Sequence, residues 1–263
     1  MDLGLQNSVA VVTGGSDGIG KGAAISMAKE GARIAICARR PNLLELAATE
    51  IKNAGSNEVL ALPTDVTKPD ELKILFEKIM SEFGRIDILV NNAGTSSADS
   101  FGVQDDDVWQ ADLDLKLFAA IRCSRIAIPH MKAGGGGRII NITTVGGKAP
   151  EAASVPTSVS RAAGIALTKA LSKEYAPDNI LVNTVCIGFI KAGQHEARWE
   201  ALKDRGFDMT LDDWYQTQAE GIPLERYGES DEAGAVIAFL ASKHAGYITG
   251  AAINLDGGLS AVV

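Results

Sequence analysis

Short apolar runs alternate with longer amphipathic stretches along most of the chain. Six runs rich in Val, Ile, Leu and Ala are almost continuously apolar, which is typical of parallel strands buried on both faces. These runs are Ser8–Thr13, Arg33–Cys37, Glu58–Leu62, Ile86–Val90, Arg138–Ile142 and Leu181–Ile187. A seventh run, Ala251–Asn254, predicts one more strand at an edge of the sheet.

Between the runs, apolar residues recur every three or four positions, as they do on the buried face of a helix. The helical stretches are Ile19–Glu30, Leu43–Ala54, Pro69–Phe83, Val108–Met131 and Val159–Tyr175. Strands that alternate with helices predict right-handed crossovers and a parallel sheet with helices on both faces. We therefore predict an α/β protein, with one Rossmann-type, doubly wound domain of seven parallel strands over residues 1–263.

The segment after the sixth strand breaks the alternation. Gln194–Gly221 is rich in charged residues and carries Trp199, Trp214 and Tyr215. An insertion of this length at the end of a strand is typical of a functional loop or lid. We predict a helical lid over residues 191–221.

Composition limits the class of partner. The net charge is −8, which opposes binding to nucleic acid or anionic lipid, because both need clustered Lys and Arg. Cys37, Cys123 and Cys186 lie far apart in apolar runs, so we expect reduced thiols and neither a metal site nor a disulfide framework. No apolar run reaches the roughly 18 residues of a membrane helix. We expect a cytoplasmic protein that binds neither nucleic acid nor membrane.

The first strand runs into a glycine-rich turn and then a helix. The turn, Thr13–Gly20, reads TGGSDGIG, in a chain with 28 glycines. In this context glycines let the backbone approach a pyrophosphate at the helix N-terminus, where free N–H groups and the helix dipole favour an anion. The turn predicts a dinucleotide site. A purely structural turn is the alternative, because the spacing is not the GxGxxG of longer dehydrogenases.

Further motifs match one family. They are Asp65-Val66, Asn91-Asn92-Ala93-Gly94, Ile222-Pro223-Leu224, Phe239-Leu240-Ala241-Ser242, Tyr247-Ile248-Thr249-Gly250 and Leu255-Asp256-Gly257-Gly258. With the glycine turn, they make the chain resemble the short-chain dehydrogenase/reductase family along its whole length. The resemblance implies cofactor contacts from Gly14, Ser16, Asp17, Gly18, Ile19 and Gly20 in the turn, Asp65 and Val66 by the adenine, Asn92, Ala93 and Gly94 beneath the cofactor, and Arg161, Gly188 and Ile190.

The end of the second strand selects the nicotinamide cofactor. An acidic residue there would hydrogen-bond the ribose 2′-hydroxyl and repel a 2′-phosphate. This chain has Arg39 and Arg40 instead, and a guanidinium can bind a phosphate through charge-assisted hydrogen bonds. NADP(H) is therefore favoured over NAD(H), although Asp17 stands where similar proteins often carry a basic residue. The alternative is that both arginines are simply solvated.

Enzymes that resemble this chain use a catalytic tetrad of Ser, Tyr, Lys and Asn. The flanking segments align without a gap and place other residues at all four positions: Thr144 for Ser, Thr157 for Tyr, Arg161 for Lys and Lys116 for Asn. A shift in the alignment cannot restore the Tyr, because the first Tyr in the chain is Tyr175. Ala192 likewise replaces a Thr that holds the carboxamide in similar proteins. The four substituted positions are our candidate catalytic residues.

These substitutions change the available chemistry. Thr157 is a poor general acid, because its hydroxyl has a pKa far above the value of about 10 for a phenol. Arg161 stays charged and could hold a ribose or stabilise an oxyanion. Lys116 would have a lowered pKa if it faced the site beside Arg161, and could act as acid, base or nucleophile. Its alternative is a solvated helix face. His195 and Tyr215 in the lid are more typical of packing residues than of catalytic ones.

Three functions remain open. The first is an NADP(H)-binding oxidoreductase that acts on a small alcohol or carbonyl. The second keeps the cofactor but performs lyase-like or dehydratase-like chemistry through Lys116 and Arg161. The third is a catalytically silent, cofactor-binding regulatory subunit. Resemblance also implies a homodimer or homotetramer built through the two long helices, Val108–Met131 and Val159–Tyr175.

Overall fold

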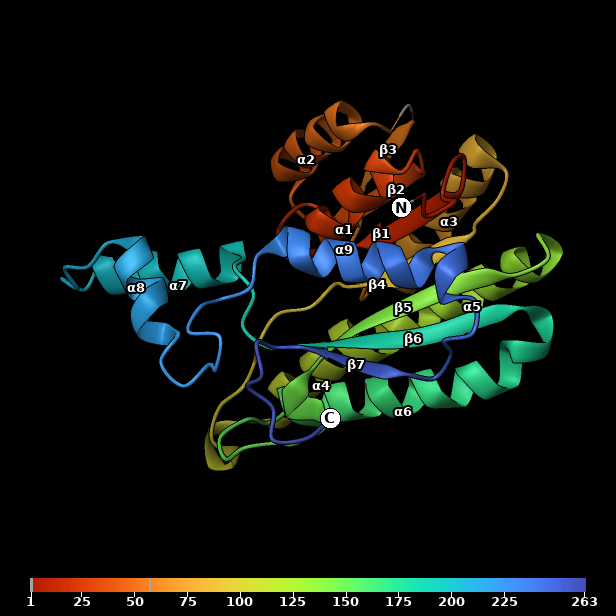
Figure 1. Cartoon of the computed structure of the whole chain (residues 1–263). Helices are drawn as coiled ribbons and strands as arrows, with labels where there is room; N and C mark the ends of the chain where they lie inside the picture. The colour runs from red at the N-terminus through yellow and green to blue at the C-terminus, as the bar shows by residue number, and fades with distance from the viewer. Residues whose placement is uncertain (1, 57) are drawn as a thin grey trace.

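The computed structural model describes residues 2–56 and 58–263, which form one seven-stranded parallel sheet (Figure 1). The strand order is β3-β2-β1-β4-β5-β6-β7, and every pair of neighbours is parallel. The strands are β1 (Val9–Thr13), β2 (Arg33–Ala38), β3 (Val59–Pro63), β4 (Ile88–Asn91), β5 (Gly137–Thr144), β6 (Ile180–Ile187) and β7 (Ala252–Leu255). The predicted fold class is confirmed, with β7 at an edge.

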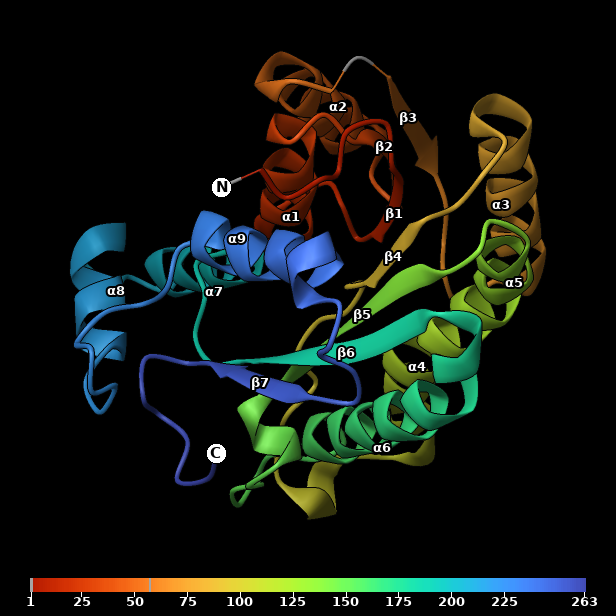
Figure 2. The same cartoon turned by 45° about the vertical axis from the view of Figure 1, so that its right-hand side comes forward.

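Helices cover both faces of this sheet (Figure 2). They are α1 (Gly18–Lys29), α2 (Pro41–Ala54), α3 (Pro69–Phe83), α4 (Asp106–Leu113), α5 (Ala119–Ala133), α6 (Thr157–Tyr175), α7 (Gly193–Lys203), α8 (Leu211–Gln218) and α9 (Ser230–Ala241). Alternate residues of β1 divide between two cores: Ala10 and Val12 pack with α1, α2 and α9, whereas Val9 and Val11 pack with α3 and α5. This alternation explains why each strand is apolar throughout, because both of its faces are buried.

One predicted helix differs from the structure. The stretch Val108–Met131 was expected to be continuous, but α4 and α5 are joined by a π-helical turn, Asp114–Phe118. A π-turn inserts one extra residue and rotates the side chains that follow it. Apolar spacing cannot reveal a single extra residue. The turn contains Lys116, whose side chain is thereby directed into the protein.

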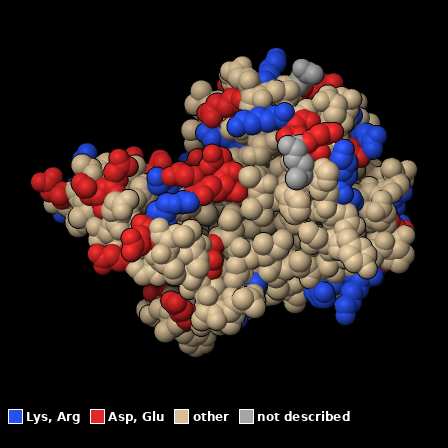
Figure 3. Space-filling view, viewed as in Figure 1, with Lys and Arg blue, Asp and Glu red and all other residues tan. Residues whose placement is uncertain are grey.

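The lid consists of α7 and α8, which project away from the carboxyl ends of the strands (Figure 1). A third, smaller core joins α8 to the segment that follows it: Trp214, Tyr215, Ala219, Ile222 and Tyr227. On the face in Figure 3, acidic side chains gather over the lid and the start of α9, whereas the surface over β7 and α6 carries few charges. Within the described chain, no helix has the length and apolarity needed to span a bilayer.

Candidate active site

The turn between β1 and α1 is built around glycine. Gly14 and Gly18 have φ angles of +65° and +52°, a conformation that side chains with a Cβ rarely adopt. A Cβ on Gly20 would lie 2.3 Å from the carbonyl oxygen of Gly14 and 2.4 Å from Asn92 Nδ2. The glycines therefore serve a close backbone approach, as a dinucleotide cradle needs.

The loop after β4 fastens this turn. Asn92 Nδ2 donates to the carbonyl oxygens of Thr13 (2.9 Å) and Gly14 (3.0 Å). Thr13 Oγ1 accepts hydrogen bonds from the backbone N–H groups of Asn92 (3.0 Å) and Ala93 (3.1 Å). Two loops that are distant in sequence thus form one rigid surface at the carboxyl ends of β1 and β4.

Basic and acidic groups meet after β2 and β3. Partial desolvation acts against ionisation of the Asp65 carboxyl, but hydrogen bonds from Thr67 and the charge of the exposed Arg39 lower its pKa. Arg40 is exposed too and occupies the N-cap position of α2. Two guanidiniums are therefore open to a phosphate group beside the cradle.

The cofactor residues expected from sequence lie near the carboxyl ends of strands, except Arg161, which lies in α6. Gly14, Ser16, Asp17, Gly18, Ile19 and Gly20 follow β1, Arg39 and Arg40 follow β2, Asp65 and Val66 follow β3, Asn92, Ala93 and Gly94 follow β4, and Gly188 and Ile190 follow β6. Such an edge is where open α/β sheets bind ligands. The glycine cradle and the exposed arginines fit an NADP-type dinucleotide, while the carboxylate of Asp17 brings an opposing charge into the glycine turn.

A buried ion pair occupies the catalytic end of the site. The Lys116 ammonium is bonded to the carboxylate of Asp112, and both side chains have no exposed surface. Lys116 Nζ also donates to Thr157 Oγ1 over 2.8 Å. The solvated helix face considered for Lys116 is wrong, because the side chain has no exposed surface and is paired with Asp112. Thr157, which is half-buried, is the outermost member of this cluster.

Arg161 completes the cluster from the next turn of α6. Its Nη1 donates to the carbonyl oxygen of Ile142 over 2.7 Å. A Cβ on Gly94 would lie 2.6 Å from Arg161 Nη2 and 3.5 Å from Lys116 Cγ, so the loop after β4 contacts both side chains. The structure therefore brings Lys116, Thr157 and Arg161 together, next to the loop predicted to lie beneath the cofactor.

Burial sets the electrostatics of this cluster. Desolvation and the neighbouring Arg161 charge lower the pKa of Lys116 to about 8, although Asp112 acts in the opposite direction. Burial likewise lowers the pKa of Arg161 to about 10. Lys116 is thus a cation that can lose its proton near neutral pH, whereas Arg161 stays charged.

Sequence reasoning missed Asp112. Its Oδ1 binds Lys116 and lies 3.4 Å from Thr157 Oγ1, while its buried Oδ2 has no hydrogen-bond partner among the described residues. The signal was present, because Asp112 precedes Lys116 by four residues, the spacing of a helical ion pair. Thr144 ends β5 next to the turn Val145–Gly147, which packs on α6.

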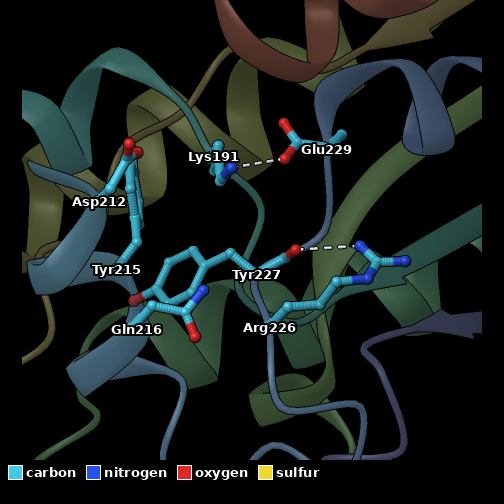
Figure 4. Close-up of a pocket in the computed structure, with 7 residues that line it drawn as sticks. All are labelled: Lys191, Asp212, Tyr215, Gln216, Arg226, Tyr227 and Glu229. Carbon is cyan, nitrogen blue, oxygen red and sulfur yellow. Dashed lines mark hydrogen bonds and ion pairs between the residues drawn. The ribbon is translucent and has the colours of Figure 1, made fainter.

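The lid contributes a separate pocket. A cavity of about 340 Å³ is lined by Lys191, Asp212, Tyr215, Gln216, Arg226, Tyr227 and Glu229 (Figure 4). None of the four candidate catalytic residues lines it. Tyr215 and His195 pack against Tyr227, at ring distances of 5.0 Å and 5.3 Å. Burial raises the pKa of Tyr215 to about 12 and lowers the pKa of His195, so both side chains are neutral packing groups.

Metal ligation is not part of this geometry. Among residues 2–56 and 58–263, no group of three His, Cys, Asp or Glu side chains could hold a metal ion. The three cysteines are buried and free.

Comparison with known proteins identifies the class. The family model described as enoyl-(acyl carrier protein) reductase matches residues 14–260. The chain is 34% identical to the 3-oxoacyl-(acyl-carrier-protein) reductase FabG of Staphylococcus epidermidis, over 96% of this chain and 99% of that protein. The chain therefore belongs to the short-chain dehydrogenase/reductase family, whose members are NAD(P)-dependent oxidoreductases.

Solved structures agree with this family. L-sorbose reductase from Gluconobacter frateurii, in a complex with NADPH and L-sorbose, is 36% identical over the whole of both chains, with a TM-score of 0.94. An F189W variant of actinorhodin polyketide ketoreductase with NADPH is 30% identical, with a TM-score of 0.90 and coverage of 97% of this chain and 98% of that chain. Both similar proteins are reductases with NADPH bound.

Proposed function

We propose that this protein is an NADP(H)-dependent reductase of a small ketone, in which Lys116 and Thr157 deliver the proton. One observation carries the proposal: Lys116 Nζ, with a pKa of about 8, lies 2.8 Å from Thr157 Oγ1. A group that titrates near the working pH can act as a general acid. The half-buried hydroxyl of Thr157 links that group to the surface of the site.

The proton path follows from the hydrogen bonds of Thr157. Its oxygen already accepts from Ser97 N (2.9 Å) and from Lys116 Nζ, and its own hydrogen has only a long contact, 3.4 Å, with Asp112 Oδ1. The hydroxyl can therefore turn and donate to a substrate oxygen while it takes a proton from the Lys116 ammonium. Asp112 then faces the neutral amine, which regains its proton through the half-buried Thr157 hydroxyl once the product has left.

The cofactor would be held by residues at the strand ends. Gly14, Gly18 and Gly20 allow the pyrophosphate close to the backbone, and Arg39 would bind the 2′-phosphate. Bound there, NADPH supplies the hydride for the carbonyl carbon. Arg161, buried and charged, would stabilise negative charge that develops on the substrate oxygen. Support for NADP(H) also comes from the two similar reductases whose structures contain NADPH.

The similar proteins suggest two substrate classes, and a panel of compounds from both classes would distinguish them. L-sorbose reductase suggests polyhydroxy ketones, and the FabG relatives suggest 3-oxoacyl thioesters. Loss of NADPH absorbance should be followed with both classes for the wild type, Lys116→Met and Thr157→Val. We expect turnover with a ketone, and a loss of about 10²- to 10⁴-fold in each variant, typical of a missing general acid. Equal rates in wild type and Lys116→Met would refute the proton path.

A silent cofactor-binding subunit is the second candidate, and one observation favours it. Lys116 and Asp112 are fully buried and neutralise each other, so the cluster could be purely structural. A quadruple variant, Lys116→Asn with Thr144→Ser, Thr157→Tyr and Arg161→Lys, would restore the family tetrad. If only this variant turns over, with the wild type binding NADPH and never oxidising it, the protein is a silent subunit.

The geometry does not favour a lyase that uses Lys116 as an amine nucleophile. The side chain has no exposed surface, and its ammonium is bonded to both Asp112 and Thr157. Borohydride should therefore trap no carbonyl substrate on Lys116. A homodimer or homotetramer stays a prediction, which light scattering of the purified protein would test.

A further inference from the structure

The carboxylate of Asp17 lies between the N-termini of two helices. Its Oδ1 accepts from Gly18 N over 2.7 Å, and its Oδ2 accepts from Gly193 N over 3.1 Å. Gly18 begins α1, which carries the dinucleotide turn, and Gly193 begins α7, the first helix of the lid. The positive ends of two helix dipoles thus meet at one negative charge, which stabilises both ends.

The lid helix depends on this distant residue for its cap. The N-cap position of α7 is Ala192, whose methyl group cannot accept a hydrogen bond. Asp17 supplies the missing acceptor. The contact is close, because a Cβ on Gly193 would lie 2.2 Å from Asp17 Oδ2, and one on Gly18 would lie 2.8 Å from Ala192 Cβ. The lid therefore starts directly against the dinucleotide turn.

A second polar contact, between the start of the lid and the start of α9, is weaker. Lys191 pairs with Glu229 over 2.6 Å, but the two side chains are 37% and 50% exposed, and ion pairs in water contribute little. The cavity in Figure 4 lies between α8 and Arg226 and Glu229, beside the packed rings of Tyr215 and Tyr227. Of these two polar contacts, the half-buried one at Asp17 is the stronger attachment.

We propose that Asp17 is a positioning residue that latches the lid to the dinucleotide turn, and that its charge opposes the cofactor's pyrophosphate there. A pyrophosphate is favoured at the N-terminus of α1 for the same reason as the carboxylate. Its entry requires Asp17 to move away or to lie beside a second anion. Cofactor binding and release of the lid are therefore coupled. This inference rests on the proposed function only in taking NADP(H) as the dinucleotide that binds at the turn.

Trypsin cleavage of the free protein tests the latch. Arg198, Lys203 and Arg205 are exposed lid sites. Asp17→Ser keeps a good cap for α1 but is too short to reach Gly193. Loss of a hydrogen bond to a charged group raises the open population by about tenfold or more, and cleavage follows that population. We expect cleavage about tenfold faster in Asp17→Ser, and unchanged in the exposed lid control Asp208→Asn. Equal rates for wild type and Asp17→Ser, both folded by circular dichroism, would overturn the latch.

NADPH binding tests the charge. The lid residues Trp199 and Trp214 report binding through their fluorescence, and Asp17→Asn removes the charge while leaving one oxygen acceptor. We expect NADPH to bind about fivefold more tightly to Asp17→Asn at low salt, a gain that shrinks at high salt. Equal or weaker binding would overturn the charge effect. If NADPH binds neither wild type nor variant, the proposed function fails, while the trypsin result still decides the latch.

Discussion

The cradle after β1 and β4 and the cluster at the start of α6 lie at the same edge of the sheet, but they depart from the family pattern to different degrees. The cradle keeps its glycines, since a Cβ at Gly20 would collide with backbone and with Asn92. The cluster replaces every expected catalytic side chain. Backbone geometry tolerates almost no change, whereas a side-chain cluster can be exchanged if its volume and charge are matched.

The side chains that form the cluster match one another in charge and in volume. A lysine at position 116 brings a buried charge, and Asp112, four residues earlier, neutralises it. Thr157 is shorter than a Tyr and leaves space for the Lys116 ammonium, which bonds to its hydroxyl. Each of the three side chains depends on the others, because replacing any one of them alone would leave a buried polar group without a partner.

The largest effect should come from breaking the cluster. Asp112→Asn leaves the buried Lys116 charge without its counter-ion, so we expect a loss of about 3–5 kcal/mol in the free energy of unfolding, measured with urea. The control is Glu77→Gln, which removes an exposed pair with Lys73 at the same four-residue spacing and should cost about 0.5 kcal/mol or less. The double variant Asp112→Leu with Lys116→Met should recover most of the stability; similar losses in Asp112→Asn and Glu77→Gln would contradict the buried pair.

The cradle should be the next most sensitive region. Gly20→Ala places a Cβ against the Gly14 carbonyl, so we expect a destabilisation of about 1–3 kcal/mol and loss of NADPH binding. The matched control is Gly102→Ala, where a Cβ would have nothing within 4 Å. Thermal unfolding and fluorescence titration measure both effects. Normal NADPH binding by Gly20→Ala would contradict the conclusion that the cradle tolerates substitution less well than the cluster.

Arg39 tests the selectivity of the cradle for NADP(H). Because a hydrogen bond to a charged group contributes about 1.5–3 kcal/mol, Arg39→Ala should weaken NADPH binding by roughly tenfold to a hundredfold. Binding of NADH, which lacks the 2′-phosphate, should stay the same. Lys52→Ala, an exposed substitution near the end of α2, is the control. Equal losses for NADPH and NADH would show that Arg39 does not read the phosphate.

The smallest effect is the pH dependence of the cluster. In the proposed reaction, reduction needs the protonated form of Lys116, whose pKa is lowered to about 8. The rate should be constant below that pH and fall by about tenfold per unit above it. Stopped-flow single turnovers would measure it without product release. A rate that stays flat well above pH 8 would exclude Lys116 as the proton donor.

Local pattern was sufficient for the fold, and the resemblance to the family supplied the expected site positions. Strand runs such as Arg33–Cys37 are apolar on both faces, and the turn at Thr13–Gly20 carries its geometry in its glycines. The prediction of a lowered pKa for Lys116 beside Arg161 is confirmed in direction. These inferences succeed because backbone conformation and burial leave their mark on residues next to one another in the chain.

Only the tertiary structure decided what those positions do to one another. The π-turn that buries Lys116 adds a single residue to a helix and leaves the apolar spacing almost unchanged. Asp17 binds Gly193 across 176 positions of sequence, and no local pattern records that contact. The energies of a buried charge or a shared cap depend on distance and desolvation in space. The sequence by itself therefore determined the sheet and the cradle, while packing decided the partners of Lys116 and Asp17.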